Sequence, residues 1–287
     1  MTPADTAPVQ ATTRAPRAQR PRVQLTLQVL RKEQLSSHMV RIIVGGPDMA
    51  KFEAKDATDM YVKIHFLRPG VEYAEPVDIF AIRDTMPAEH WSVTRTYTLR
   101  WVDLVAQELA IDFVLHGDTG LAGPWAAAAE PGDRIIFTNP GGAYKPSADA
   151  DWHLFAGDEA ALPAIAAGLE ALPSEARGNA YIEVETAADI QPLVKPDGVE
   201  LTWVFRNGTT PDRSTALLDA VANGPWLEGT VHAFVHGERE YMKSLRDLLI
   251  KQRGLDRTQV SLSGYWAYGR TEDNFQAEKK EPIGKIL

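Results

Sequence analysis

The sequence predicts two domains of different class, an antiparallel β-barrel followed by a doubly wound parallel α/β domain. Its 287 residues are enough for two domains of ordinary size. From residue 23 to about 138, short strand-like runs follow one another and are separated by turn residues. After residues 139–142 (NPGG), strand-like and helix-like runs alternate, as they do in βαβ units.

The first 22 residues are rich in Pro, Ala and Thr and carry four arginines. They lack the apolar stretch of roughly 7–15 residues found in a secretory signal. We therefore expect a disordered tail and a cytoplasmic protein. An arginine-rich, acid-poor start also fits an organelle transit peptide, although no amphipathic repeat supports that alternative.

The barrel is expected over residues 23–145. Its strand-like runs either alternate or are rich in β-branched residues, and they cover 23–29, 39–44, 60–66, 92–102 and 109–116. Clusters of Gly, Pro and Asp interrupt them, and one short helix is expected at 124–129. Antiparallel strands at this spacing favour a closed barrel or a sandwich.

The α/β domain is expected over residues 150–287 and ends in a charged helical tail. Its strand-like runs cover 152–157, 180–186, 200–205, 230–237 and 259–266. Helix-like runs follow several of them, at 159–172, 212–222 and 238–252. This alternation predicts a parallel sheet covered by helices.

Composition excludes several classes of function. The absence of cysteine removes disulfides, zinc fingers, iron–sulfur clusters and thiolate ligation of haem. A net charge of -9 argues against a nucleic-acid partner, and no apolar run is long enough to span a membrane. His232 and His236 are four apart in a strand, about 13 Å along it, so we expect no protein-ligated metal.

Residues 95–98 (RTYT) form a local motif inside a predicted strand. Arg95 and Tyr97 share one face of the strand, and Thr96 and Thr98 share the other. An arginine two residues from an aromatic ring can neutralise a pyrophosphate while the ring lies along a flat heterocycle. Taken alone, the tetrapeptide also fits an ordinary exposed barrel face.

The next strand leads into a glycine-rich turn. Alternate apolar residues of 111–115 are expected to fill the barrel, which leaves Asp112, Val114 and His116 free for a ligand. The turn at 117–123 then opens a short helix at Pro124. Free N–H groups there suit a cofactor phosphate, although the glycine spacing is not that of a G-x-G-x-x-G fingerprint.

Together these motifs resemble the siderophore-interacting protein family, cytoplasmic FAD-dependent ferric-siderophore reductases of the ferredoxin–NADP reductase-like superfamily. RTYT, DFVLHG, GLAGPWA, PGD and NPGG resemble that family's flavin-binding barrel. GDEAALPAI, HGE and GYW with the following GR resemble its nicotinamide-binding domain and C-terminal signature. The resemblance covers about residues 23–282.

The resemblance implies three sets of site residues. FAD would be held by Arg95, Thr96, Tyr97, Thr98, Asp112, Val114, His116, Thr119, Ala122, Gly123, Trp125, Tyr265 and Trp266. NADH or NADPH would meet Gly157, Asp158, Glu159, Ala160, Gly237 and Glu238. Cations that face an anionic ferric siderophore would be Lys63, Arg270, Lys279 and Lys280, for which ordinary surface charge is the alternative. Two positions depart from the family. Ala160 replaces a usual Thr or Ser, so one hydroxyl contact to the nucleotide is missing. Leu121 replaces a frequent proline.

The implied activity is electron transfer from NAD(P)H through FAD to siderophore-bound Fe(III), which releases Fe(II). Iron would be substrate and not cofactor, and a monomer is expected. Two other interpretations stay open. One is a ferredoxin-coupled or general flavin reductase on the same scaffold, and the other is a non-catalytic siderophore-binding protein.

Overall fold

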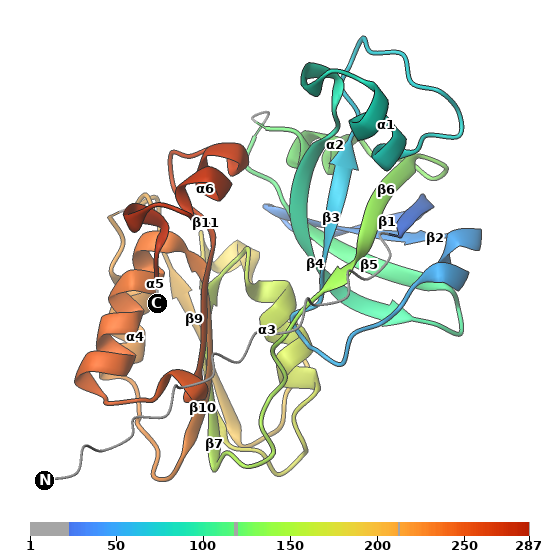
Figure 1. Ribbon diagram of the computed structural model, residues 1–287. Helices are drawn as coiled ribbons and strands as arrows, with labels where there is room; N and C mark the ends of the chain where they lie inside the picture. Colours follow the sequence, from blue (N-terminus) through green and yellow to red (C-terminus); the bar gives the residue numbers. More distant parts are fainter. Residues whose placement is uncertain (1–22, 118–119, 212, 287) are drawn as a thin grey trace, which may run out of the picture.

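The computed structural model describes residues 23–117, 120–211 and 213–286. A barrel and a sheet domain lie side by side within them (Figure 1). Six antiparallel strands close the barrel in the order β1-β2-β5-β4-β3-β6. The strands are β1 (Gln24–Ser36), β2 (Met39–Gly45), β3 (Tyr61–Phe66), β4 (Val93–Asp103), β5 (Glu108–Val114) and β6 (Arg134–Gly141).

Alternating side chains explain why these strands close on themselves. In β3, Val62 and Ile64 are buried in the barrel while Tyr61 and Lys63 are exposed. Phe113 of β5 is completely buried among the same apolar side chains. Two helices and two short 3₁₀ turns connect the strands: η1 (Pro47–Lys51), α1 (Ile79–Thr85), η2 (Ala88–His90) and α2 (Ala122–Ala128).

The second domain is a five-stranded parallel sheet in the order β11-β10-β7-β8-β9. Its strands are β7 (Trp152–Asp158), β8 (Gly178–Val184), β9 (Val199–Phe205), β10 (Val231–Glu238) and β11 (Val260–Trp266). The strand order reverses between β7 and β10, where ligands bind in doubly wound sheets. Barrel and doubly wound sheet confirm the predicted fold class.

Helices cover both faces of the sheet (Figure 1). The helices and short turns of this domain are α3 (Leu162–Glu170), η3 (Ala187–Asp189), α4 (Ala216–Asn223), α5 (Arg239–Arg246), the π-helical η4 (Asp247–Gln252), η5 (Arg257–Gln259), α6 (Glu272–Glu278) and η6 (Pro282–Gly284). Helices α4 and α5 pack on one face, and α3 packs on the face nearer the barrel. No helix in the described part of the chain has the length and apolar character to cross a membrane.

One hydrophobic core belongs to both domains. Met39 of β2 is buried with Phe155 and Leu162 of the second domain, and Val114 of β5 packs against the same group. At the rim of this core, Arg100 of β4 pairs with Glu170 of α3 through two contacts of 2.5 and 2.9 Å. The two domains are therefore held in a fixed relation by apolar packing with charged pairs around it.

A second rim contact joins the turn between β1 and β2 to η3. The Asp189 carboxylate accepts the Ser37 hydroxyl at 2.7 Å and lies 2.9 Å from His38 Nδ1. Its other oxygen accepts hydrogen bonds from the backbone N–H and hydroxyl of Thr186. Burial alone would raise the pKa of Asp189, but these hydrogen bonds lower it to about 2.

Replacing Asp189 by Asn is expected to destabilise the protein at neutral pH and to change little near about pH 2. Since the folded pKa lies below the unfolded value of about 3.9, the ionised carboxylate stabilises the fold above that value. The contribution is lost as the pH falls toward 2. Melting temperatures of both proteins across this range measure the effect. The exposed Asp197→Asn is the matched control, and equal melting temperatures for Asp189→Asn and wild type at pH 7 would contradict the assignment.

Candidate functional site

The motif Arg95–Thr98 lies in β4, at the side of the barrel that faces α6. The Arg95 side chain is 16% exposed and its guanidinium lies 3.3 Å from Asp273 of α6. The Tyr97 ring contacts Phe113 with a centroid distance of 4.4 Å, and burial raises the pKa of its hydroxyl. Thr96 is exposed and lies opposite Lys63 of β3.

Thr98 and Tyr265 join this strand to the second domain. Thr98 is buried, and its side chain lies close to the Tyr265 hydroxyl at the end of β11: burial raises the pKa of that hydroxyl, and Thr98 opposes the rise. The Tyr265 ring stands edge-on to His236 of β10, with centroids 5.0 Å apart. Thr98 and Tyr265, which are far apart in the sequence, therefore lie close together where the two domains meet.

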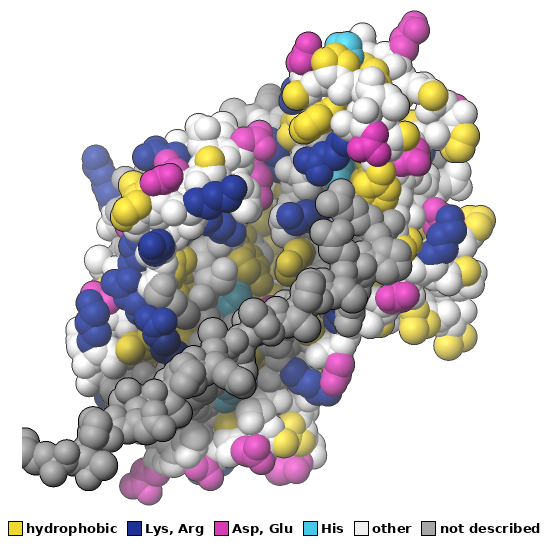
Figure 2. Space-filling view, in the orientation of Figure 1, with side chains coloured by type: hydrophobic (Ala, Val, Ile, Leu, Met, Phe, Trp, Pro, Cys, Tyr) yellow, Lys and Arg dark blue, Asp and Glu magenta, His cyan; other side chains and the backbone are white. Residues whose placement is uncertain are grey.

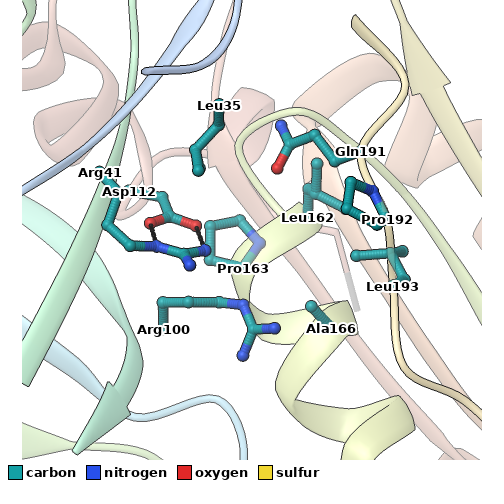
Figure 3. A pocket seen from close by; sticks show the side chains of 10 residues that line it. All are labelled: Leu35, Arg41, Arg100, Asp112, Leu162, Pro163, Ala166, Gln191, Pro192 and Leu193. Atoms are coloured by element: carbon teal, nitrogen blue, oxygen red, sulfur yellow. Dashed lines mark hydrogen bonds and ion pairs between the residues drawn. The ribbon is translucent and has the colours of Figure 1, made fainter. Parts of the chain in front are cut away.

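Asp112 is not free for a ligand, which corrects the expectation from the sequence. Arg41 donates two hydrogen bonds to its carboxylate, at 2.7 and 2.9 Å (Figure 3). Asp112 is buried because this outer face of β5 is covered by the second domain, against whose core Val114 also packs. The two ion-paired side chains line a cavity of about 110 Å³ with Leu162. That volume is well below the several hundred Å³ of a dinucleotide or siderophore site.

The backbone after β5 has free space beside Gly117. Gly117 and Gly120 have φ values of +75° and +87°, which few other residues adopt, and no atom lies within 4 Å of a Cβ added at Gly117. Exposed His116 lies at the start of this turn and has interactions of its own. Thr119 lies outside the described residues.

The beginning of α2 packs onto the barrel. Ala122 and Gly123 are buried, and a Cβ at Gly123 would lie 3.4 Å from the carbonyl of Val114. Trp125 contacts Phe66 and Phe113 with centroid distances of 5.8 and 5.6 Å. Trp125 and Tyr97 therefore pack against the same ring, that of Phe113.

In the second domain, Asp158 links the carboxyl ends of three strands. Its carboxylate accepts hydrogen bonds from the backbone of Ala160 at 3.0 Å, from the backbone of Glu238 at 2.8 Å and from the Trp266 indole at 2.8 Å. Burial raises the pKa of Asp158 to about 6, although the indole and the Glu238 N–H oppose that rise. Asp158 thus fixes the switch point itself.

Two glycines allow the backbones of β7 and β10 to approach each other closely at this switch point. A Cβ at Gly157 would lie 2.4 Å from the carbonyl of His236, and one at Gly237 would lie 2.8 Å from the Asp158 carboxylate. Gly237 also has φ +153°. Only glycine fits at either position, so β7 and β10 end close together beside half-buried Ala160.

Glu238 also differs from its expected role as a nucleotide contact. Its carboxylate accepts the backbone N–H groups of Glu240 and Tyr241, which caps α5, and of Tyr268. It is 1% exposed. Because it is buried and its oxygens accept these backbone hydrogen bonds, Glu238 positions α5 and the tail.

The sequence reasoning missed a charged cluster beside Glu159. Arg206, directly after β9, contacts Glu159, Glu183 and Glu185 through its guanidinium at 2.6, 3.3 and 3.2 Å. Charged residues at the carboxyl ends of three neighbouring strands were the signal that could have revealed it.

Figure 2 shows Lys and Arg side chains on both sides of the hollow between the domains. Burial and the charge of Lys63 lower the pKa of Lys279, while Glu272 raises it, so the two lysines act on each other across the hollow. Arg270 instead pairs with Glu278 at 2.7 Å, and Lys280 is exposed.

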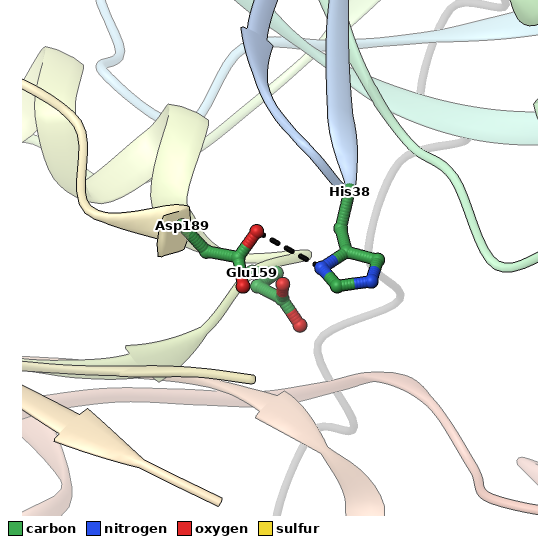
Figure 4. Close-up of side chains that lie close together, drawn as sticks. All are labelled: His38, Glu159 and Asp189. Carbon is green, nitrogen blue, oxygen red and sulfur yellow. Dashed lines mark hydrogen bonds and ion pairs between the residues drawn. The ribbon is translucent and has the colours of Figure 1, made fainter. Parts of the chain in front are cut away.

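His38, Glu159 and Asp189 form a further group whose ligand-type atoms lie within 4.8 Å of one another (Figure 4). Asp189 already binds Ser37 and His38 through one oxygen, and Glu159 binds Arg206. We therefore read the group as part of the contact between the domains.

Residues 28–144 match the family described as the siderophore-interacting FAD-binding domain, and residues 150–269 match the siderophore-interacting protein family. A Mycobacterium tuberculosis protein named uncharacterized is 44% identical over 266 residues, which are 88% of this chain and 94% of the relative.

Two further relatives carry names that state an activity. The ferric vibriobactin reductase ViuB of Vibrio cholerae is 31% identical over 88% of this chain and 93% of its own. The NADPH-dependent ferric-chelate reductase of Escherichia coli is 28% identical over 84% of this chain and 91% of its own.

Solved structures agree in fold. A siderophore utilization protein from T. fusca matches with a TM-score of 0.76 and 34% identity, covering 88% of this chain and 95% of that protein. The ferredoxin reductase of carbazole 1,9a-dioxygenase has a TM-score of 0.59 at 15% identity, covering 86% of this chain and 67% of that one, and shares the fold alone. Motifs, architecture and relatives agree, and the chain belongs to the siderophore-interacting protein family.

Proposed function

We propose that the protein is an FAD-dependent reductase of ferric siderophores that takes its electrons from NADH or NADPH. The observation that carries this proposal is the contact between Thr98 of the barrel and Tyr265 of the sheet domain. It brings the flavin-type motif of β4 beside the switch point, where a dinucleotide binds in this fold. The names of the relatives from Vibrio cholerae and Escherichia coli support the same activity.

The barrel residues fit FAD by the chemistry of their side chains. Arg95 offers a guanidinium for a pyrophosphate, and the Tyr97 ring is supported by Phe113 and Trp125. The backbone turn at Gly117 and Gly120 leaves room for phosphate oxygens. Of the other residues expected to hold FAD, we retain Thr96, Thr98, His116, Thr119, Ala122, Gly123, Tyr265 and Trp266 as proposed contacts, and give Asp112 and Val114 a supporting role.

The chemistry that bound FAD would supply is acceptance of two electrons together as a hydride and their release one at a time to iron. The chain's own residues supply position. Trp266 is fixed by its hydrogen bond to Asp158, and Tyr265 by its contact with Thr98, so both rings stand in defined places at the domain boundary. Burial lowers the pKa of neighbouring His236 to about 3, so its imidazole is neutral at physiological pH.

The nucleotide would approach the strand ends at Gly157, Asp158, Glu159, Ala160 and Gly237. The N–H of Ala160 is already taken by Asp158, and Ala160 has no hydroxyl. Binding of the nucleotide would therefore gain no hydrogen bond from the backbone N–H or the side chain of Ala160 at this turn.

Positive charge around the hollow suits an anionic ferric chelate. Lys63 and Lys279 come from different domains. Burial is the main cause that lowers the pKa of Lys279, Glu272 opposes it, and repulsion by Lys63 lowers the pKa further. An anion between them would relieve that repulsion. Arg270 and Lys280 are part of the same proposal, as are the division into an FAD domain at 23–145 and an NAD(P)H domain at 150–287, the monomeric state and the cytoplasmic location.

The test is an absorbance spectrum followed by anaerobic reduction. We expect flavin bands near about 380 and 450 nm, bleaching by NADH or NADPH, and recovery of the bands as a ferric siderophore is reduced in the presence of an Fe(II) chelator. A colourless protein that ignores added FAD would favour a non-catalytic siderophore-binding protein. A yellow protein bleached by reduced ferredoxin and by neither nucleotide would favour the ferredoxin-coupled alternative.

Replacing Arg95 by Gln is expected to weaken FAD binding by roughly 10- to 100-fold, because a charge-assisted hydrogen bond to the pyrophosphate is lost. Titration of the apoprotein with FAD, followed by flavin fluorescence, measures the change. Arg134→Gln is the matched control, since Arg134 is a barrel arginine paired with exposed Glu75. Equal FAD affinity in both variants would show that Arg95 does not bind the cofactor.

The double variant Lys63→Gln, Lys279→Gln is expected to raise KM for an anionic ferric siderophore several-fold and to leave KM for a neutral ferric chelate unchanged. The loss should shrink at high salt, because screening weakens the same attraction in the wild type. Lys251→Gln, which removes an exposed lysine paired with Asp247, is the control. An equal effect on both chelates would remove these lysines from the substrate site.

A further inference from the structure

The proposed reaction leaves one charged cluster without a function. Arg206 lies between three carboxylates, those of Glu159 after β7, Glu183 within β8 and Glu185 directly after β8. The contacts use the Nε, Nη1 and Nη2 atoms of the guanidinium. All four side chains lie at the carboxyl end of the sheet.

The cluster carries more negative than positive charge. The Arg206 side chain is 9% exposed and Glu183 is completely buried, so little water reaches the contacts between them. Burial raises the pKa of Glu183, while Arg206 and Ser214 lower it. Even if Glu183 were neutral, two carboxylates would still face one guanidinium.

The position of the cluster matters because dinucleotides bind across the carboxyl ends of doubly wound strands. An acidic side chain at the end of the second strand hydrogen-bonds the 2′-hydroxyl of NADH, whereas an available arginine receives the 2′-phosphate of NADPH. In this domain the second strand is β8, and Glu185 follows it with 29% of its side chain exposed. Arg206, which follows the next strand, is already surrounded by carboxylates.

We propose that Glu159, Glu183, Glu185 and Arg206 form a selectivity element that makes this protein prefer NADH over NADPH. The inference rests on the proposed function, since it assumes that a nicotinamide nucleotide binds at these strand ends. A 2′-phosphate brought here would meet surplus carboxylate charge, and Arg206 could reach it only by giving up its ion pairs. Glu185 accepts one hydrogen bond on each oxygen, from the Gly208 N–H and from Arg206, and its side chain is 29% exposed. Because each carboxylate oxygen can accept a second hydrogen bond, a ribose diol, by contrast, can donate its 2′-hydroxyl proton to Glu185.

One other cation lies near the cluster along the chain. Arg213 follows β9 by a few residues and is exposed, and its neighbour Ser214 donates a hydrogen bond to Glu183. An exposed cation is screened by water and contributes little to binding. If the protein preferred NADPH, Arg213 would therefore be the residue that binds the 2′-phosphate.

The first measurement needs no electron transfer. Calorimetric titration of the FAD-loaded full-length protein with NAD⁺ and with NADP⁺ is expected to give at least about ten-fold tighter binding of NAD⁺. The ratio of kcat/KM for NADH and NADPH, with ferricyanide as acceptor, should show the same preference. The relative from Escherichia coli is named as NADPH-dependent, so family membership does not decide the outcome.

Glu185→Gln tests the element directly, because it removes one charge at a partly exposed position and keeps the size of the side chain. We expect it to lower the NAD⁺ preference several-fold while the flavin spectrum stays unchanged. Glu200→Gln is the matched control, since Glu200 is an exposed glutamate near the other end of β9.

The outcomes separate this inference from the proposed function. Tighter binding of NADP⁺, lost in Arg213→Gln, overturns the inference and leaves the reductase proposal intact. Binding of neither nucleotide overturns the inference and the nicotinamide donor together. Selective binding of NAD⁺ without reduction of any ferric siderophore supports the inference and counts against the proposed substrate.

Discussion

The whole site depends on one buried carboxylate, that of Asp158. Three strands that are far apart in sequence end where this side chain accepts their hydrogen bonds: β7 through Ala160, β10 through Glu238 and β11 through Trp266. The ladder pairs these ends backbone to backbone, as between Glu238 and Trp266, and the side chain of Asp158 adds hydrogen bonds to that pairing. It does so at the place where the strand order reverses.

A second constraint is the core that both domains share. Because Met39 of the barrel is buried with Phe155 and Leu162 of the sheet domain, the barrel strand that carries Thr98 cannot move freely relative to the end of β11. Ion pairs at the rim, such as Arg100 with Glu170, add specific polar contacts beside this apolar packing. The two halves of the site are thus aligned by packing that lies outside the site.

The fold and the β4 motif could be predicted from the sequence because they depend on local periodicity. The roles of Asp112 and Glu238 could not, since their partners are remote: Arg41 precedes Asp112 by 71 residues, and Tyr268 follows Glu238 by 30. The Arg206 cluster was missed for the same reason, as its carboxylates come from two other strands. A carboxylate beside a motif looks available until the structure shows what already binds it.

The contact between Arg95 and Asp273 has one more consequence. Helix α6 is held to its own domain by Glu278, which pairs with Arg239 and Arg270, while its first turn reaches the barrel arginine. One guanidinium thus serves both the tail and any anion bound at β4. The two binding events are thermodynamically linked. If the docked tail lowers the affinity of β4 for that anion by a given free energy, the bound anion weakens docking of the tail by the same free energy.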